Sequence, residues 1–196
     1  MNRATPDSWS RQKTTHGFSA DQVISALQKE IRRGHTENAV LLAHEMITTG
    51  TELEEFLWRR LLVISVEDVG FGDTGAAVLV NALNQMRSAL GEDARDRELF
   101  AVHSIRHLCG CPKDRSSDEM TLWVKMAAER GRALPSIPEY ALDKHTAAGK
   151  KMGRGLRHFM EEGARVRPEV PDRDRTYRER ITAMLDEQRR LEHEES

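Results

Sequence analysis

The sequence is short of the features that mark several large classes of protein. Its 196 residues include only two cysteines, 5% aromatic residues and no run of about 18 apolar residues that could cross a membrane. Cys109 and Cys111 lie one residue apart, which suits neither a disulfide framework nor a secreted protein. Residues 1–18 lack the apolar core of a signal peptide. We therefore expect a cytoplasmic protein with reduced thiols and no membrane partner.

An excess of charge of one sign is also missing. The formal net charge is −2, from 30 basic and 32 acidic residues, so the chain as a whole has no positive field that would draw it onto nucleic acid. Any contact with DNA must come from a local cluster of cations. With 38% hydrophobic residues, the chain can bury one largely aliphatic core.

The sequence also lacks a phosphate-binding loop. Such a loop needs G-x-x-x-x-G-K-[ST] between a buried strand and a helix, so that backbone amides face the phosphates. The glycine- and lysine-rich stretch is DKHTAAGKKMGRG, residues 143–155. The residues that lead into it have a helical pattern instead of that of a strand, and no Ser or Thr follows its last glycine. We therefore expect that the chain alone is not an ATPase, and we assign it no catalytic residue and no cofactor.

The histidines and cysteines near Cys109 allow two interpretations. His103 and His107 are four residues apart, which places them on one helix face, and together with Cys109 and Cys111 they could be drawn as four zinc ligands. Against this, Cys-x-Cys is tighter than the usual two-residue spacer, and histidines at this spacing more often pack or cap. The sequence therefore predicts no metal site.

Helical periodicity is what the sequence has in abundance. Apolar residues recur at helical spacing between capping residues and glycine stops, and no stretch alternates as a strand does. Residues 51–70 are apolar around most of the helix circumference, which predicts a central helix. We expect an all-α fold, a compact bundle of about seven helices. The first six span residues 19–34, 36–50, 51–70, 73–91, 93–110 and 116–131.

The rest of the chain is more polar. Residues 1–18 have no pattern and predict a flexible tail. The all-helical domain is expected to span residues 19–163, followed by a linker at 164–175 and a mostly polar helix at 176–196. The few apolar residues of this last helix leave it marginal alone.

Read as one helix, residues 138–162 have an apolar and a basic side. His145 falls on the apolar side. Gly149 and Gly153 cost about 1 kcal/mol each in a helix interior, which the close approach of a helix or a phosphate backbone would offset. Three interpretations of the basic side remain: a solvated surface, a contact with DNA, or a contact with another anionic partner. The candidate contacts with DNA phosphates are Lys144, Lys150, Lys151, Arg154 and Arg157.

Glu67 and Asp68 are adjacent at a predicted helix C-terminus, where the helix dipole disfavours anions. We predict a structural polar anchor in which Arg59 or Arg60, or the backbone amides that follow, satisfy the two carboxylates. An enzyme of nucleotides or nucleic acid is the alternative, with Glu67 and Asp68 meeting Lys144 and His145 in a cleft. Consecutive helical residues point about 100° apart, which argues against convergence without outside help.

Several separate pieces occur in the order of a known family. They are Gln28–Arg32, Ala39–Ala43, Arg59–Leu61 and Ser65–Gly70, the last with Val66 in addition, and then Cys111, Pro112 and Lys113. Residues 22–130 on this basis resemble the C-terminal region of the clamp-loader-like AAA+ ATPases known as replication-associated recombination protein A, or MgsA.

The resemblance implies an all-helical oligomerisation module that assembles tetramers beside DNA at stalled replication forks. The ATPase core of this family and its usual C-terminal segment are missing from the sequence. We therefore expect a free-standing, short relative of the family. The leading hypothesis is a non-enzymatic scaffold or adaptor in DNA replication or repair, with a homo-oligomer and DNA as partners. A protein-interaction module for a separate replication or repair ATPase is the further alternative.

Overall fold

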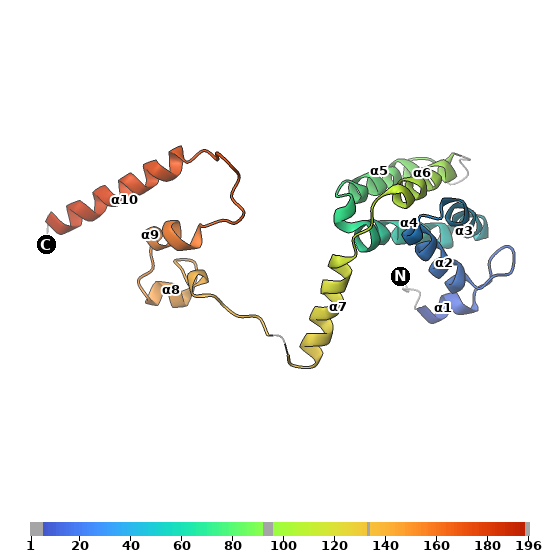
Figure 1. The fold of residues 1–196 in the computed structure, drawn as a ribbon, viewed down its shortest axis with the longest axis horizontal. Helices are drawn as coiled ribbons and strands as arrows, with labels where there is room; N and C mark the ends of the chain where they lie inside the picture. Colours follow the sequence, from blue (N-terminus) through green and yellow to red (C-terminus); the bar gives the residue numbers. More distant parts are fainter. Residues whose placement is uncertain (1–5, 92–95, 133, 195–196) are drawn as a thin grey trace. The chain divides into compact units, whose positions relative to one another are not determined.

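A computed structural model of the chain describes residues 6–91, 96–132 and 134–194. Helices make up the ordered structure of these residues, without a strand, and the all-α prediction is confirmed (Figure 1). The chain divides into two compact units, residues 1–133 and 134–196, and this division falls inside the range 19–163 expected as one domain. None of the described helices is long and apolar enough to cross a lipid bilayer.

The first unit holds the helices that the sequence predicted, each shortened by a few residues at its ends. The glycine stop at Gly34 is a left-handed C-cap, with φ 76° and the amide of Gly34 donating to the Ile31 carbonyl. The predicted start at Asp93 lies outside the described residues. The helices are α2 (Ala20–Arg33), α3 (Thr36–Thr49), α4 (Thr51–Ile64), α5 (Ala76–Ser88), α6 (Arg97–Gly110) and α7 (Ser116–Glu129).

Helix α4 is central, as its all-round apolar pattern predicted. It contacts α2, α3, α5 and α6, which lie around it in Figure 1, and its Leu57, Trp58 and Leu61 are almost completely buried. A buried ion-pair network crosses the same helices: Glu54 of α4 accepts hydrogen bonds from Arg87 of α5 (3.2 Å) and Arg97 of α6 (3.0 Å). The core is therefore mainly aliphatic, and a buried polar network joins α4, α5 and α6.

The predicted continuous helix over residues 51–70 is wrong at its end. Helix α4 stops at Ile64, and the chain continues as a π-helical turn, η1 (Ser65–Val69), and a 3₁₀ turn, η2 (Gly70–Gly72). A π turn holds one more residue per turn than an α-helix. Val66, which the chain has in addition to the motif of the family it resembles, lies inside this turn.

Part of the expected N-terminal tail is ordered. Residues Pro6–Arg11 form helix α1, where Trp9 is 5% exposed and its ring lies 5.1 Å from that of Phe56. The following loop is held on α3, since the His16 amide donates to Glu45 (2.9 Å). Burial alone would raise the pKa of Glu45, but hydrogen bonds from Thr14 and His16 outweigh it and lower this pKa to about 2. One buried tryptophan is too weak a pattern to predict this docking from sequence.

In the second unit, the predicted single helix over residues 138–162 is wrong. The segment is broken into four short turns and helices. Its expected apolar side is not buried, since His145 is exposed and Met152 is 51% exposed. The long polar helix after it does form, with no buried residue. The elements are η3 (Glu139–Ala141), α8 (Ala147–Lys151), α9 (Leu156–His158), η4 (Phe159–Gly163) and α10 (Thr176–Glu194).

Local side-chain chemistry explains the breaks. The Asp143 carboxylate accepts a hydrogen bond from the His145 amide (2.9 Å), and Thr146 Oγ1 accepts one from Gly149 (3.0 Å). Both bonds offer the backbone an alternative to the helical ladder. Gly153 then ends α8 with φ 71°, a left-handed conformation that favours glycine.

Gly149 should be essential to this turn. A Cβ built on Gly149 would lie 2.0 Å from the Asp143 carbonyl oxygen, so Gly149→Ala must displace backbone and destabilise the second unit by about 1–3 kcal/mol. The matched control is Gly155→Ala, whose Cβ would meet nothing within 4 Å and whose effect should stay within about 0.5 kcal/mol. Amide hydrogen exchange over residues 139–163 of the full chain measures both. Equal exchange in the two variants would contradict the role of Gly149.

Candidate functional site

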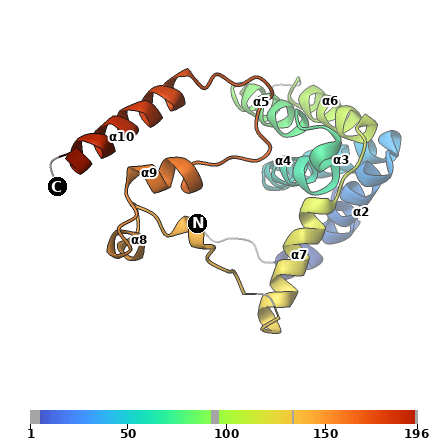
Figure 2. The same cartoon turned by 60° about the vertical axis from the view of Figure 1, so that its left-hand side comes forward.

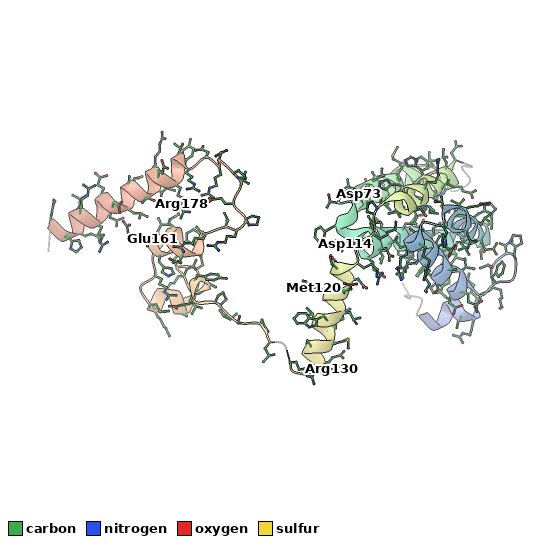
Figure 3. All side chains as sticks on the ribbon, in the orientation of Figure 1. Asp73, Asp114, Met120, Arg130, Glu161 and Arg178 are labelled. Atoms are coloured by element: carbon green, nitrogen blue, oxygen red, sulfur yellow. The ribbon has the colours of Figure 1, made fainter. Side chains whose placement is uncertain are left out.

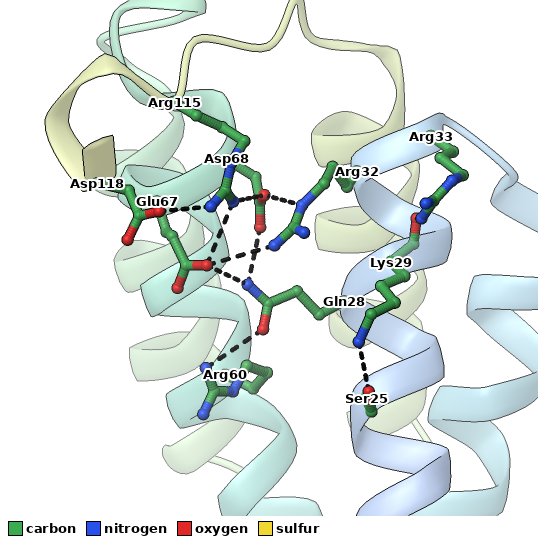
Figure 4. Close-up of polar contacts among 10 residues, drawn as sticks. All are labelled: Ser25, Gln28, Lys29, Arg32, Arg33, Arg60, Glu67, Asp68, Arg115 and Asp118. Carbon is green, nitrogen blue, oxygen red and sulfur yellow. Dashed lines mark hydrogen bonds and ion pairs between the residues drawn. The ribbon is translucent and has the colours of Figure 1, made fainter. Parts of the chain in front are cut away.

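Asp68 is the centre of a polar cluster that joins three elements of the first unit (Figure 4). Its side chain is completely buried, at the end of the π turn η1. Arg32 and Gln28 of α2 donate to its carboxylate, Gln28 at 3.0 Å, and Arg115 donates from the segment before α7 at 2.7 Å. We call these residues, with Arg60, Glu67 and Asp118, the Asp68 cluster.

Glu67 completes the charge balance of the cluster. It accepts hydrogen bonds from Gln28 (2.8 Å), Arg32 (3.3 Å) and Arg115 (3.3 Å). Arg115 also pairs with Asp118 in the first turn of α7. The π turn lets two consecutive carboxylates face the same arginines, because its residues are rotated differently from those of an α-helix.

The arginines predicted to anchor the carboxylates are not the ones that pair with them. Arg60 joins the Asp68 cluster through Gln28, whose side-chain oxygen accepts from it at 3.3 Å. Arg59 lies over the Phe56 ring, 5.4 Å from its centroid. The partners that the sequence analysis missed are Arg32 and Arg115. Arg32 stood inside a motif of the resembled family, which was a usable signal, whereas the contact with Arg115 depends on tertiary structure.

The electrostatics of the cluster suit a structural role. Burial alone would raise the pKa of Asp68, but hydrogen bonds from Arg32, Gln28 and Arg115 outweigh it and hold this pKa below its usual range. The hydrogen bond between Arg115 and Asp68 also raises the pKa of Arg115. A carboxylate that is buried, fully paired and more acidic than usual is a poor general base near neutral pH.

Backbone contacts next to the cluster clamp two loops together. The Asp114 amide donates to the Asp68 and Val69 carbonyls, at 3.0 and 3.1 Å. Glycine is required on the facing loop: a Cβ on Gly70 would lie 2.3 Å from the Asp114 carbonyl oxygen, and one on Gly72 2.3 Å from that of Pro112. The segment 112–115 is therefore fixed against residues 68–72.

The histidines and cysteines considered as zinc ligands separate into two groups. His107 and Cys111 meet Asp73, which follows the clamped loop. His103 is exposed and Cys109 is buried, and neither joins this group of donors. Burial raises the pKa of the Cys111 thiol, and the hydrogen bond to Asp73 raises it further.

The five cations expected on one helix face lie on separate short elements. Arg154 is turned inward, where it donates to the carbonyls of Glu139 (2.8 Å) and Leu142 (2.9 Å). Arg157 pairs with Asp186 of α10 at 2.7 Å, and Lys144 lies 5.5 Å from the Phe159 ring centroid. Lys150 and Lys151 of α8 are exposed.

Arginines gather elsewhere in the second unit. A hollow of about 260 Å³ lies between the segment after η4 and the start of α10. Glu169 is its acidic lining residue, and it pairs with two of the arginines. Arg178, labelled in Figure 3, donates to the Met160 carbonyl. The arginines that line the hollow are Arg165, Arg167, Arg173, Arg175 and Arg178.

Helix α7 carries an apolar surface that the first unit does not cover. Its N-terminal end lies against η1, and the rest extends away from the other helices of this unit (Figures 1 and 2). Ala127 is its one buried residue, while Met120 is 67% exposed and Trp123 61%. Beside the helix, an apolar hollow of about 430 Å³ is lined by Leu62, Val63 and Val66.

Comparison with known proteins places these features in a family. The family described as MgsA AAA+ ATPase C terminal matches residues 34–166. Replication-associated recombination protein A of Bacillus subtilis is 30% identical over 134 residues, which are 68% of this chain and 31% of that protein. An uncharacterized AAA domain-containing protein of Mycobacterium tuberculosis is 24% identical over 154 residues, 76% of this chain and 33% of that protein. The chain thus spans about a third of the length of these relatives.

The Asp68 cluster predicts an asymmetry between two arginines. Arg115→Ala leaves a buried carboxylate short of a partner, so it should lower the free energy of unfolding by about 1–3 kcal/mol. Arg59→Ala removes only an exposed contact with a ring and should cost less than about 0.5 kcal/mol. Chemical denaturation followed by circular dichroism measures both. Equal losses would mean that the cluster does not stabilise the fold.

The pH dependence of this difference has a defined sign. The pKa of Asp68 is lowered in the folded protein, so its stabilisation is complete above the unfolded pKa of about 4. This stabilisation is lost as the pH falls through the lower folded value. The deficit of Arg115→Ala should therefore be largest near neutral pH and shrink below about pH 4. A deficit that grows on acidification would contradict this assignment.

Proposed function

This chain belongs to the MgsA AAA+ ATPase C-terminal family, and from that premise we propose that it is a non-enzymatic, cytoplasmic module. It self-associates through α7 and serves as a scaffold or adaptor on DNA in replication and recombination. The observation that carries the proposal is the apolar surface of α7 that the first unit leaves uncovered. The printed name of the Bacillus subtilis relative supports the process.

The spacing of residues on α7 favours an interface over a solvated helix. Met120, Trp123, Val124 and Ala127 stand at i, i+3, i+4 and i+7, the pattern by which a helix packs its apolar stripe. Here the first three are at least half exposed. A helix of about 21 Å with such a stripe is marginal alone. Covering the stripe would stabilise both the helix and the assembly.

A second copy of this chain is the partner that the charges on α7 favour. Glu119, Trp123, Met126 and Arg130 stand four, three and four residues apart and share one side of the helix. One end of this line is acidic and the other basic. Two copies of α7 packed antiparallel place Glu119 beside the partner's Arg130 at both ends, with the aromatic and methionine side chains between them. Such a surface is self-complementary, as a two-fold interface requires.

DNA contact is proposed for the second unit, with a changed set of residues. Arg154 and Arg157 are engaged within the protein, so they are no longer the leading candidates. Arg165 pairs with Glu162 at 2.9 Å but its side chain is 66% exposed. With Arg167 at the same arginine-lined hollow, and the exposed Lys150 and Lys151, it is placed to meet phosphates. Contacts with phosphates position a protein on DNA without reading its sequence.

The enzymatic alternative loses its proposed residues. It needs Glu67 and Asp68 to act on a substrate, but Asp68 is inaccessible and both carboxylates already accept hydrogen bonds from arginines. His145, the proposed partner, is itself hydrogen-bonded to Asp143 at 3.1 Å. The arginine-paired carboxylates, of which Asp68 is also buried, therefore favour the scaffold over the enzyme.

Self-association is tested by Trp123→Glu, which places a charge in the centre of the α7 surface. We expect the wild-type chain to sediment above its monomer mass of 22.3 kDa and the variant to dissociate at least about 30-fold more readily, as for an interface hot spot. Leu99→Glu is the matched control, because Leu99 is 65% exposed but lies on α6. A monomeric wild type, or an unchanged mass for Trp123→Glu, would contradict the proposal.

The antiparallel arrangement has its own test within the same experiment. Glu119→Arg and Arg130→Glu should each weaken the assembly, since each sets like charges opposite one another. The double variant should recover most of the loss by exchanging the two ends. Additive losses in the double variant would exclude the antiparallel pair.

DNA contact is tested by fluorescence anisotropy with single-stranded and forked DNA across a salt series. Arg165→Glu with Arg167→Glu should lower the affinity at least about 10-fold and flatten the salt dependence. Arg189→Glu with Arg190→Glu, an equal change of charge on exposed residues of α10, is the control and should have a smaller effect. Equal effects of the two pairs would mean that the hollow makes no local contact, and no binding at low salt would remove DNA from the account.

A further inference from the structure

Three metal-ligating side chains meet outside the Asp68 cluster, at one end of α6. Asp73 lies in the loop before α5, and His107 lies in the last turn of α6. Cys111 is the C-cap residue of α6. Among the described residues, they are the group of histidine, cysteine and acidic donors whose ligand atoms all lie within 4.8 Å of one another. The proposed function uses none of the three.

The distances among the three donor atoms match the edges of a tetrahedron around a zinc ion. His107 Nε2 lies 3.3 Å from Asp73 Oδ2 and 3.4 Å from Cys111 Sγ, and Cys111 Sγ lies 3.5 Å from the same Asp73 oxygen. Zinc bonds of about 2.0 Å to nitrogen and oxygen and 2.3 Å to sulfur place tetrahedral ligand atoms roughly 3.3–3.6 Å apart. One ion therefore reaches all three atoms without moving the backbone.

The backbone holds the three donors in place. The clamp between residues 68–72 and 112–115 fixes the loop of Asp73 against the segment of Cys111. Asp73 also uses one oxygen for its own loop: Gly75 donates its amide to Oδ1 at 2.8 Å, which leaves Oδ2 for His107 and Cys111. Support of this kind orients the ligands of metal sites.

The donors lie at the edge of an open hollow of about 630 Å³. Cys111 is buried, while the side chains of His107 and Asp73 are about a third exposed, at 29% and 34%. Phe71, Thr74, Arg106 and Pro112 line the rest of the hollow. A fourth protein donor is not present among the described residues around it, so a bound ion keeps one position for water. Three protein ligands and one open position distinguish such a site from a closed structural zinc site.

We propose that Asp73, His107 and Cys111 bind one zinc ion, with the fourth position open to the hollow. One nitrogen, one oxygen and one sulfur ligand suit zinc and cobalt, whereas calcium and magnesium require oxygen ligands. The ion ties the end of α6 to the loop before α5, so it also stabilises the clamp beside the Asp68 cluster. The proposal differs from the sequence analysis, which expected no metal site. That expectation rested on Cys-x-Cys spacing, and the sequence could not place Asp73 beside His107 and Cys111.

Cobalt is the probe, because tetrahedral cobalt absorbs visible light and a thiolate ligand adds a charge-transfer band in the near ultraviolet. The full chain, reduced and freed of metal with a chelator, is titrated with Co²⁺ and then with Zn²⁺. We expect one equivalent of Co²⁺ to give both absorptions and one equivalent of Zn²⁺ to remove them. Thermal unfolding with and without Zn²⁺ gives a second readout, since a ligand that binds only the folded state raises the melting temperature.

Variants separate this site from adventitious binding. Cys111→Ser should abolish the charge-transfer band, and Asp73→Asn and His107→Gln should weaken cobalt binding by at least about 100-fold, since even supporting residues are worth 10–100-fold. The matched controls are Cys109→Ser and His103→Gln, the same changes on the same helix outside the site. Circular dichroism confirms that each variant is folded.

Two results would overturn the proposal. One is wild-type protein that gives no thiolate band with cobalt. The other is cobalt binding that Cys111→Ser leaves intact or that the control changes reduce equally, which would mean an adventitious ion only. The function proposed for α7 is independent of both outcomes.

Discussion

The first unit depends on one buried charge. Asp68 has no contact with solvent, and a buried carboxylate destabilises a fold unless it is paired and hydrogen-bonded. Its partners come from α2 and from the segment before α7, about 36 and 47 residues away in the chain. The arginines of both segments are therefore needed to offset the burial of Asp68 near the end of η1. This requirement fixes the loop 112–115 against residues 68–72.

The two surfaces for which functions are proposed both adjoin that loop. At one end of it, Cys111 is brought beside Asp73, although 38 residues separate them. At the other end, Arg115 and Asp118 fix where α7 begins, so that the helix leaves the core with its apolar stripe uncovered. The same polar anchor adjoins the clamped loop and reaches into α7 through Asp118. It thus positions both the three donors proposed to bind zinc and the start of the helix proposed as the interface.

Periodicity and capping predicted the six successive helices of the first unit, because apolar spacing and glycine stops such as Gly34 are local signals. Sequence reasoning failed where side chains compete with the helical ladder. Asp143 and Thr146 break the predicted helix over 138–162 through hydrogen bonds that periodicity cannot register. It also failed where partners are distant: Arg60 was nearer in sequence to Asp68, but Arg32 and Arg115 are the arginines that meet it. The apolar residues of α7 were read correctly as a helix, yet their exposure appears only in the structure.

The central claim is that α7 is covered by a second copy of the chain. Hydrogen exchange of the wild-type protein at several concentrations tests it without mutation, because an interface protects its own amides only while the copies are associated. The account predicts that amides of residues 120–129 exchange faster on dilution, while those of the central helix α4 keep the same rate at every concentration. Exchange in α7 that does not depend on protein concentration would contradict it.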